Sequence, residues 1–192
     1  MNIAFYKPYG VLCSFTHEAE NERDSAKRTL SEFGMPAGIY AAGRLDYDSE
    51  GLLILSDDGS LIHRLTDPRF KLPKTYYVLV EGVPTPAALD ALRAGIPLKG
   101  VQTQPCDADV LMPEPQLPAR EKPVTPHGPT TWLKIVLREG RKRQVRHMTA
   151  YVGLPTLRLV RVAIGPVSLA ELRPGQWRRL TAGETRLLTA RQ

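Results

Sequence analysis

Short apolar runs along the chain predict strands separated by turns. Predicted strands cover Ile3 to Tyr6, Val11 to Phe15, Ile39 to Ala42, Leu52 to Leu55, Tyr76 to Val80 and Leu133 to Leu137. The first two flank Lys7-Pro8-Tyr9-Gly10, whose Pro-x-Gly pattern is strong turn chemistry. The run Tyr76 to Val80 is rich in β-forming residues, and a period of two places Tyr76, Val78 and Val80 on one face.

Helices are predicted where capping signals precede apolar residues at helical spacing. The sequence Thr29-Leu30-Ser31-Glu32 fits a capping box opening a short helix that stops at Gly34. A second helix is predicted over Ser60 to Leu65. Thr85 and Pro86 suit the N-cap and first position of a third helix, which ends at Gly95. A fourth is indicated by Val145, Met148 and Val152.

Two segments lack such patterns. The polar stretch His17 to Arg28 predicts a loop, and residues 113–130 contain six prolines in eighteen positions. Repeated proline is incompatible with a central strand or a helix interior, so 113–130 predicts an irregular surface loop. We therefore expect residues 1–192 to form a single α+β domain with a mixed, mostly antiparallel sheet and this long loop within it.

Composition narrows the class of protein. The apolar runs are far shorter than a bilayer span, and MNIAFYKPYG has no basic leader followed by a secretory apolar core. A cytoplasmic protein without membrane contact is the expectation. Cys13 and Cys106 have neither a CxxC partner nor a nearby His, which argues against a zinc site and a disulfide framework.

The positive charge is concentrated in the last third of the chain. Residues 133–192 carry 13 Lys+Arg against 3 Asp+Glu, whereas the remainder carries 13 against 17. Arg141, Lys142, Arg143 and Arg146 fall within six residues. A solvated basic face is the general explanation of a charge run, but this clustering favours a polyanionic partner such as RNA.

The stretch from 43 to 59, GRLDYDSEGLLILSDDG, displays a candidate catalytic acid. It places Asp46 beside Arg44 on a loop between the predicted strand Ile39 to Ala42 and the apolar run Leu52 to Leu55, which the turn Asp57-Asp58-Gly59 closes. This position at the end of a sheet is where enzymes commonly expose a reactive carboxylate.

A second candidate site lies in LKIVLREGRKRQVRHMTAYV, residues 133–152, at a predicted strand-to-helix corner. Leu133, Ile135 and Leu137 alternate as in a half-buried strand, and Gly140 permits a turn. Free N–H groups and the macrodipole at a helix start favour an anion there. The corner therefore suits a phosphate.

These stretches resemble the motifs of RNA pseudouridine synthases of the RsuA type. Residues 43–59 resemble GRLDxxTxGLLLLTNDG, with Ser49 in place of the usual Thr, and residues 139–148 resemble EGRxRQVRRM. Lys74 to Val78 resembles KxYxV. The opening FYKPYGVLCS resembles KPxGVxxS, and LRLVRVAIGPVSL resembles the closing RLxRxxIGxxxL. The resemblance spans nearly the whole chain in order.

The resemblance implies a role for four residues, and the need to extrude the target nucleotide suggests one for Arg44. Asp46 falls on the catalytic aspartate, Arg146 on the basic residue that pairs with it, and Tyr76 on the tyrosine that packs against the target base. Gln144 is implied to orient the active-site backbone or the substrate. For Arg44 we expect that it occupies the gap left by the target nucleotide or binds an adjacent phosphate, because that nucleotide must leave its stack. On spacing alone, core packing is the stronger explanation of Tyr76.

The implied reaction converts uridine to pseudouridine. It breaks the glycosidic bond at nitrogen 1, rotates the uracil and rejoins it through carbon 5, so no cofactor and no metal are expected. A carboxylate can attack or stabilise the anomeric carbon, or take the proton from carbon 5. Phosphate contacts are expected from Lys74, Arg141, Lys142 and Arg143.

The expected substrate is ribosomal RNA. The family's usual N-terminal S4-type domain is not expected, because Phe5 and Lys7 already belong to the catalytic domain. Members built this way resemble the E-type enzymes of large-subunit ribosomal RNA, and GPTTWLKI and LDYDSEG point the same way. We expect a monomer.

Two alternatives belong to other classes. Asp46, Asp48, Glu50, Gly51 and Asp57 fit several positions of a calcium-binding loop, but such loops join two helices, whereas Leu52 to Leu55 predicts a strand. A non-catalytic RNA-binding or ribosome-assembly protein would need only the basic third of the chain. The role of Asp46 separates that reading from the enzyme.

Overall fold

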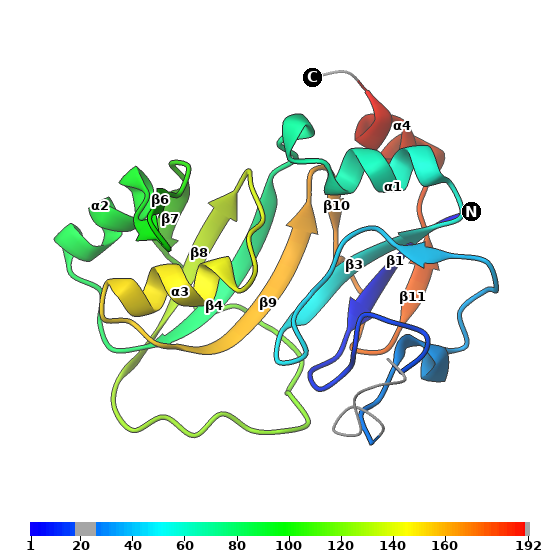
Figure 1. Ribbon diagram of the computed structural model, residues 1–192. Helices are drawn as coiled ribbons and strands as arrows, with labels where there is room; N and C mark the ends of the chain where they lie inside the picture. The colour runs from blue at the N-terminus through cyan, green and yellow to red at the C-terminus, as the bar shows by residue number, and fades with distance from the viewer. Residues whose placement is uncertain (18–25, 191–192) are drawn as a thin grey trace. The chain divides into compact units, whose positions relative to one another are not determined.

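The structure is a computed structural model that describes residues 1–17 and 26–190 (Figure 1). They form two compact units, of which the first comprises Met1–Phe70 with Gly165–Gln192 and the second Lys71–Ile164. Each unit combines antiparallel strands with α-helices, so the predicted α+β class is confirmed. Within the described ranges, no helix is long and apolar enough to cross a membrane.

The sheet of the first unit is built on β3 (Glu50–Ser56), which pairs antiparallel with β1 (Asn2–Lys7) and with β2 (Tyr40–Ala41). On its other side β1 pairs with β11 (Trp177–Arg179), and Ile3 lies opposite Arg179. All seven residues of β3 are buried. A strand covered on both faces needs apolar residues at consecutive positions, which explains why Leu52 to Leu55 shows no alternation.

Helices α1 (Gly59–Thr66) and α4 (Ala182–Thr189) pack against each other in the first unit, as Figure 1 shows. Asp58 caps α1 by accepting hydrogen bonds from the N–H groups of Ser60 and Leu61. Arg64 of α1 binds the carbonyl oxygens of Leu188 and Ala190 at the end of α4. A guanidinium there satisfies terminal carbonyls and complements the helix dipole.

Short elements complete the first unit. The predicted capping box opens η2 (Leu30–Phe33), where Glu32 accepts a hydrogen bond from the Thr29 N–H and Gly34 adopts the left-handed conformation. The unit also contains η3 (Pro68–Phe70) and β10 (Val167–Ser168).

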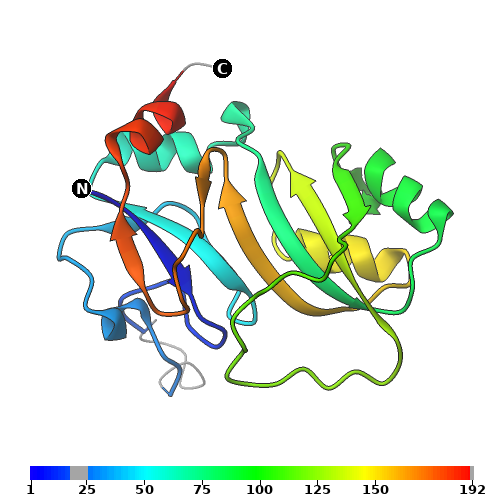
Figure 2. The ribbon, with the colours of Figure 1, turned by 180° about the vertical axis from the view of Figure 1, so that it is seen from behind.

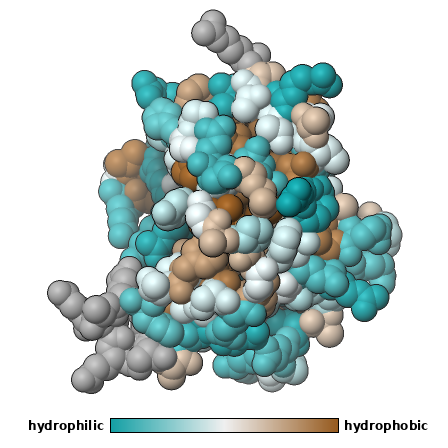
Figure 3. All heavy atoms as spheres, turned by 90° about the vertical axis from the view of Figure 1, so that its right-hand side faces the viewer, coloured by the Kyte–Doolittle hydropathy of each residue, from teal (hydrophilic) through white to brown (hydrophobic). Residues whose placement is uncertain are grey.

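The surface seen in Figure 3 is mostly hydrophilic, with small hydrophobic areas between polar side chains, as on most proteins.

One predicted strand is wrong. Within Val11 to Phe15 only Val11 forms a bridge, to Arg28. The Leu12 N–H binds the Arg28 carbonyl and the Leu30 N–H binds the Ser14 carbonyl, so this backbone pairs with an irregular segment instead of a strand. Val11 is nevertheless fully buried. The apolar pattern therefore predicted the burial of Val11 correctly, but the predicted strand does not form. Most of the loop predicted at 17–28 lies outside the described residues.

The second unit contains an antiparallel sheet in the order β9-β4-β8-β7. Its strands are β4 (Lys74–Glu81), β7 (Asp107–Val110), β8 (Thr130–Leu137) and β9 (Thr156–Ile164). Tyr76, Val78 and Val80 are buried on one face of β4, as the period of two predicts. On the neighbouring strand, Leu133 and Ile135 are buried opposite Val78 and Tyr76.

Helices α2 (Pro86–Ala94) and α3 (Gln144–Tyr151) supply the rest of this core, through Leu92, Val145 and Met148. The Thr85 hydroxyl accepts a hydrogen bond from the Ala88 N–H at 3.1 Å, which confirms the predicted N-cap. A two-stranded sheet follows α2, formed by β5 (Pro97–Leu98) and β6 (Val101–Gln102).

The proline-rich segment has no helix or strand between β7 and β8, as predicted. Figure 2 shows it passing across the side of the sheet away from α2 and α3. Two side chains tether it. Arg158 of β9 donates to the Pro118 carbonyl at 2.8 Å, and Glu81 of β4 accepts from the His127 N–H at 2.6 Å. The segment is therefore attached to its own sheet.

Gly95, which ends α2, has no room for a side chain. Its φ is +87°, and a Cβ atom there would lie 2.4 Å from the Thr103 carbonyl oxygen. We predict that Gly95→Ala lowers the free energy of unfolding by at least ~2 kcal/mol, since backbone strain and a steric clash add. Urea denaturation measures this.

Gly100→Ala is the matched control. Gly100 has a φ of +78° but no atom within 4 Å of the added Cβ, so only the cost of its backbone conformation, about 1 kcal/mol, is expected. Equal losses in the two variants would contradict the proposed clash.

Candidate active site

Asp46 lies, partly exposed, on the loop that joins β2 to β3 in the first unit. The Ser49 N–H donates to the Asp46 carbonyl at 3.0 Å, which closes a four-residue turn. Leu45 before it and Ser49 after it are buried. The loop is thus anchored by a buried residue on each side, while the Asp46 side chain reaches the surface.

The opening segment of the chain holds this loop in place. The Lys7 ammonium group donates to the carbonyl oxygens of Ser49 at 2.8 Å and Pro8 at 2.9 Å. The Gly10 N–H donates to the Tyr47 carbonyl at 2.9 Å, and the Leu45 N–H donates to Cys13 Sγ at 3.2 Å. Three contacts from residues 7–13 therefore bind the backbone on both sides of Asp46.

Lys7 is a buried charged residue, and its contacts explain why the fold tolerates it there. It is fully buried, and loss of hydration lowers its pKa to about 8, although Cys13, Glu50, Asp48 and Asp46 oppose that shift. A buried ammonium group destabilises a fold unless its donors are satisfied. Two carbonyl oxygens and nearby acids satisfy Lys7. The sequence places Lys7 in a turn and in the opening motif but predicts no contact for its side chain.

Arg44 is exposed on the same loop, two residues before Asp46. The Ser49 side chain, which replaces the usual Thr of the motif, is buried, and its hydroxyl has no hydrogen-bond partner among the described residues. Such an orphan hydroxyl is uncommon in a folded protein. It lies three residues from Asp46 in the turn that positions the carboxylate.

In the second unit, Lys74 and Tyr76 lie on one face of β4. Arg161 of β9 is paired opposite Tyr76, which places the three side chains on the same side of the sheet. Tyr76 is 8% exposed and belongs to the hydrophobic core of the unit. Burial, and then the charge of Arg161, lowers the pKa of Lys74. Two cations therefore border the predicted base-binding tyrosine.

The strand-to-helix corner is ordered by Glu139 and Gln144, both buried. Gln144 Nε2 donates to Glu139 Oε1 at 2.6 Å, and Gln144 Oε1 accepts from the Arg141 N–H at 3.0 Å. Glu139 also accepts from the Gln104 N–H at 2.8 Å. Gln144 thus holds the backbone of this corner.

Arg141 has structural partners that the sequence did not predict. Its guanidinium group donates to the carbonyl oxygens of Val101 and Gln102 at 3.1 and 2.9 Å, and it forms an ion pair with Glu139 at 3.4 Å. It joins the β5–β6 hairpin to the corner. The predicted phosphate contact of Arg141 would therefore be additional to this role.

The other basic residues of the corner lie around the start of α3. Arg143 occupies the N-cap position with a φ of +54°, and Lys142 is exposed. Arg146 lies within α3, half-buried, and its Nη1 is 3.4 Å from the Thr156 carbonyl. The structure thus places Arg44 and Asp46 on one loop of the first unit, whereas Lys74, Tyr76, Gln144 and Arg146 belong to the second.

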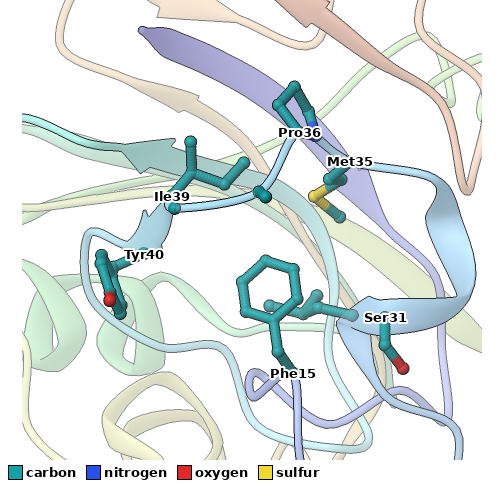
Figure 4. Close-up of a pocket in the computed structure, with 9 residues that line it drawn as sticks. Phe15, Ser31, Met35, Pro36, Ile39 and Tyr40 are labelled. Carbon is teal, nitrogen blue, oxygen red and sulfur yellow. The ribbon is translucent and has the colours of Figure 1, made fainter.

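A cavity of about 380 Å³ lies elsewhere in the first unit (Figure 4). Phe15, Met35, Pro36 and Ile39 contribute apolar walls, and Ser31 and Tyr40 add hydroxyl groups. Asp46 is not among the residues that line it. The cavity has no charged side chain that could bind phosphate or perform acid-base chemistry.

A calcium-binding loop over residues 46–57 is excluded, because Ile54, where such a loop needs an oxygen ligand or a water molecule, lies in β3. Leu52 to Leu55 are fully buried in β3, so the segment that would have to supply ligands is a core strand. Over residues 1–17 and 26–190, the structure has no group of three or more His, Cys, Asp or Glu side chains that could hold a metal ion.

Comparison with known proteins identifies the family. The family model for RNA pseudouridylate synthases matches residues 2–151, which include parts of both units. A ribosomal large subunit pseudouridine synthase E of Xanthomonas campestris is 56% identical over 93% of this chain and 94% of its own length. The protein of that name from Vibrio vulnificus is 48% identical over 93% of this chain and 74% of its own.

A solved structure supports the same assignment. A crystal structure of a pseudouridylate synthase has a TM-score of 0.80 and 29% identity, and the match covers 98% of this chain and 73% of that one. The chain therefore belongs to the RNA pseudouridylate synthase family, a class of isomerases. The non-catalytic alternative is not favoured.

Lys7, Glu139 and Arg161 are candidate site residues that sequence reasoning missed. Each stands inside or beside a motif that the resemblance quoted, but their contacts join distant segments. A charged residue inside an apolar run was an available signal, because Lys7 follows four buried positions in β1 and Arg161 interrupts the apolar run of β9.

The depressed pKa of Lys7 predicts a pH dependence of stability. Between pH 8 and 10.5 the unfolded chain keeps a proton on Lys7 that the folded chain has released, so stability from this residue rises with pH. The full rise is roughly 3 kcal/mol. We predict that this rise is present in the wild type and absent in Lys7→Met, as measured by urea denaturation from pH 7.5 to 10.5.

Lys134→Met is the control, because Lys134 is exposed on β8. Its difference from the wild type should stay constant over that range. A constant difference for Lys7→Met as well would show that Lys7 keeps an ordinary affinity for its proton in the folded protein.

Proposed function

We propose that this chain isomerises a specific uridine of large-subunit ribosomal RNA to pseudouridine, with Asp46 as the catalytic residue. The observation that carries the proposal is the 56% identity to a ribosomal large subunit pseudouridine synthase E along 93% of the chain. The Asp46 loop agrees with it, because a carboxylate there is partly exposed on a firmly held backbone.

The reaction requires only rearrangement of bonds within one nucleotide. The bond from C1′ of the ribose to N1 of uracil breaks, a bond from C1′ to C5 forms, C5 loses its proton and N1 gains one. Asp46 can attack or stabilise the electron-poor C1′, or accept the proton from C5. Either role needs an ionised carboxylate, so cations near the bound nucleotide favour it.

Three further residues are proposed to complete the site, on the strength of the motifs. Arg146 pairs with Asp46 and keeps it anionic. Tyr76 packs against the extruded uracil. Its two neighbouring cations, Lys74 and Arg161, make this position suitable for a nucleotide. Arg44 contacts the RNA next to the vacated position, since it is exposed two residues from Asp46.

Binding of the RNA is proposed to involve cations of the second unit. Lys74, Lys142 and Arg143 contact phosphates, and Arg141 does so in addition to its structural contacts. Such contacts contribute affinity that falls with salt. We further propose that the protein acts as a monomer in the cytoplasm, where ribosomal RNA is modified.

We predict that Asp46→Asn abolishes product formation while folding and RNA affinity stay near wild type. Removal of a catalytic carboxylate should reduce turnover by at least roughly 10²- to 10⁴-fold. Release of tritium from an RNA labelled at C5 of uridine measures the reaction directly, because C5 loses its proton.

The control is Asp48→Asn, which removes a carboxylate from the same turn. It should keep most of the activity. Turnover at the wild-type rate in Asp46→Asn would reject the catalytic assignment, whereas inactive wild-type protein on large-subunit RNA would reject the proposed substrate.

We predict that Arg146→Ala lowers kcat by at least ~10-fold, because loss of about 1.4 kcal/mol of charge stabilisation has that effect. Arg146→Lys should restore part of the loss, since it keeps the charge. Unchanged turnover in Arg146→Ala would refute the proposed ion pair.

A further inference from the structure

The start and outer side of helix α3 present a basic and aromatic surface, of which the proposed function uses only the phosphate contacts of Lys142 and Arg143. We define the α3 outer surface as Lys142, Arg143, His147 and Tyr151. The buried residues of α3 are Gln144, Val145, Met148 and Thr149, so the helix packs with its other side on the sheet. Figure 1 shows α3 lying against the sheet of the second unit with one side open.

The side chains of this surface have few attachments to the protein. Tyr151 is 59% exposed, and Lys142 and His147 are exposed as well. The side chains of these three residues make no hydrogen bond, ion pair or ring contact with the part of the chain that the structure describes. His147 and Tyr151 are four residues apart in the helix, so they are neighbours on its surface.

The charge around α3 has one sign. From Gly140 to Ala170 the sequence contains six Lys and Arg residues and no Asp or Glu. Arg158 and Arg161 are buried, whereas Lys142 is exposed and Arg141, Arg143 and Arg146 are half-buried. The solvent-accessible cations of this stretch therefore lie within residues 141–146. Several acids elsewhere in the unit have cationic partners of their own, as Asp90 and Asp109 do in Arg93.

We propose that the α3 outer surface binds a segment of the RNA substrate outside the target nucleotide. Lys142 and Arg143 contact its phosphates, and a base stacks on Tyr151 with His147 beside it. Charge complementarity selects this occupant, because a cationic surface with an exposed aromatic ring is how proteins bind unpaired nucleotides. The inference rests on the proposed function, from which the RNA comes.

The test measures binding and turnover separately on one large-subunit ribosomal RNA transcript. Tyr151→Ala should weaken the affinity by roughly 5- to 150-fold, the equivalent of about 1 to 3 kcal/mol for one stacked base. Tyr151→Phe should retain the affinity. At saturating RNA, kcat should be unchanged in both. Tyr40→Ala is the control, since Tyr40 is 66% exposed in the first unit.

Lys142→Ala tests the phosphate contact. The negative slope of log affinity against log salt should become shallower by about 0.7 to 0.9, the value for one phosphate contact. Lys134→Ala, an exposed lysine on β8, should leave the slope unchanged. Thermal unfolding of every variant should match the wild type, because none of these side chains is buried.

The outcomes separate the inference from the function on which it rests. If the wild type forms pseudouridine and Tyr151→Ala binds as tightly as wild type, the inference is overturned and the function stands. If the wild type binds the transcript without product, the affinities still decide the inference. Absence of binding by the wild type overturns both. A dimer that Tyr151→Ala dissociates would assign the surface to a second copy of the chain and overturn the inference.

Discussion

The hydrogen bonds from buried Lys7 to the carbonyl oxygens of Pro8 and Ser49 are the constraint on which the candidate catalytic loop depends. A loop with an exposed carboxylate buries little apolar surface of its own, so contacts from neighbouring segments must hold its backbone. Lys7 provides such contacts from β1, which is fixed on both sides by β3 and β11. Because Lys7 is buried, its ammonium group loses hydration, and this loss lowers its pKa.

The same arrangement recurs in the second unit with different chemistry. There the buried Glu139 and Gln144 organise the corner before α3, and Arg141 joins that corner to the β5–β6 hairpin. In both units a buried polar side chain binds backbone groups of an irregular segment. Such networks hold a loop firmly only when each member is satisfied. The motif residues therefore divide into those proposed to meet RNA and those that hold the backbone.

Much of the fold could be predicted from local patterns. The alternation in β4, the cap of α2 and the proline-rich segment depend on neighbouring residues, and each was confirmed. The strand expected at Val11 to Phe15 was wrong, because an apolar run indicates burial but not the hydrogen-bond partner. The Asp46 loop could be located by its flanking strands, whereas the contact of Lys7 with Ser49 joins residues 42 apart, so the partner of this buried lysine could not be predicted from neighbouring residues. The roles of Asp46, Arg146 and Tyr76 in catalysis stay predictions.

The first unit is assembled from the two ends of the chain, and this has a consequence for its synthesis. Lys71–Ile164 is continuous, so the ribosome completes every strand of the second unit before it reaches β11 and α4. β1 is translated first but cannot acquire its β11 neighbour until residue 179 has been added. Pairing across such a separation is slow. A nascent chain thus holds the Asp46 loop on an unfinished sheet until β11 has been synthesised.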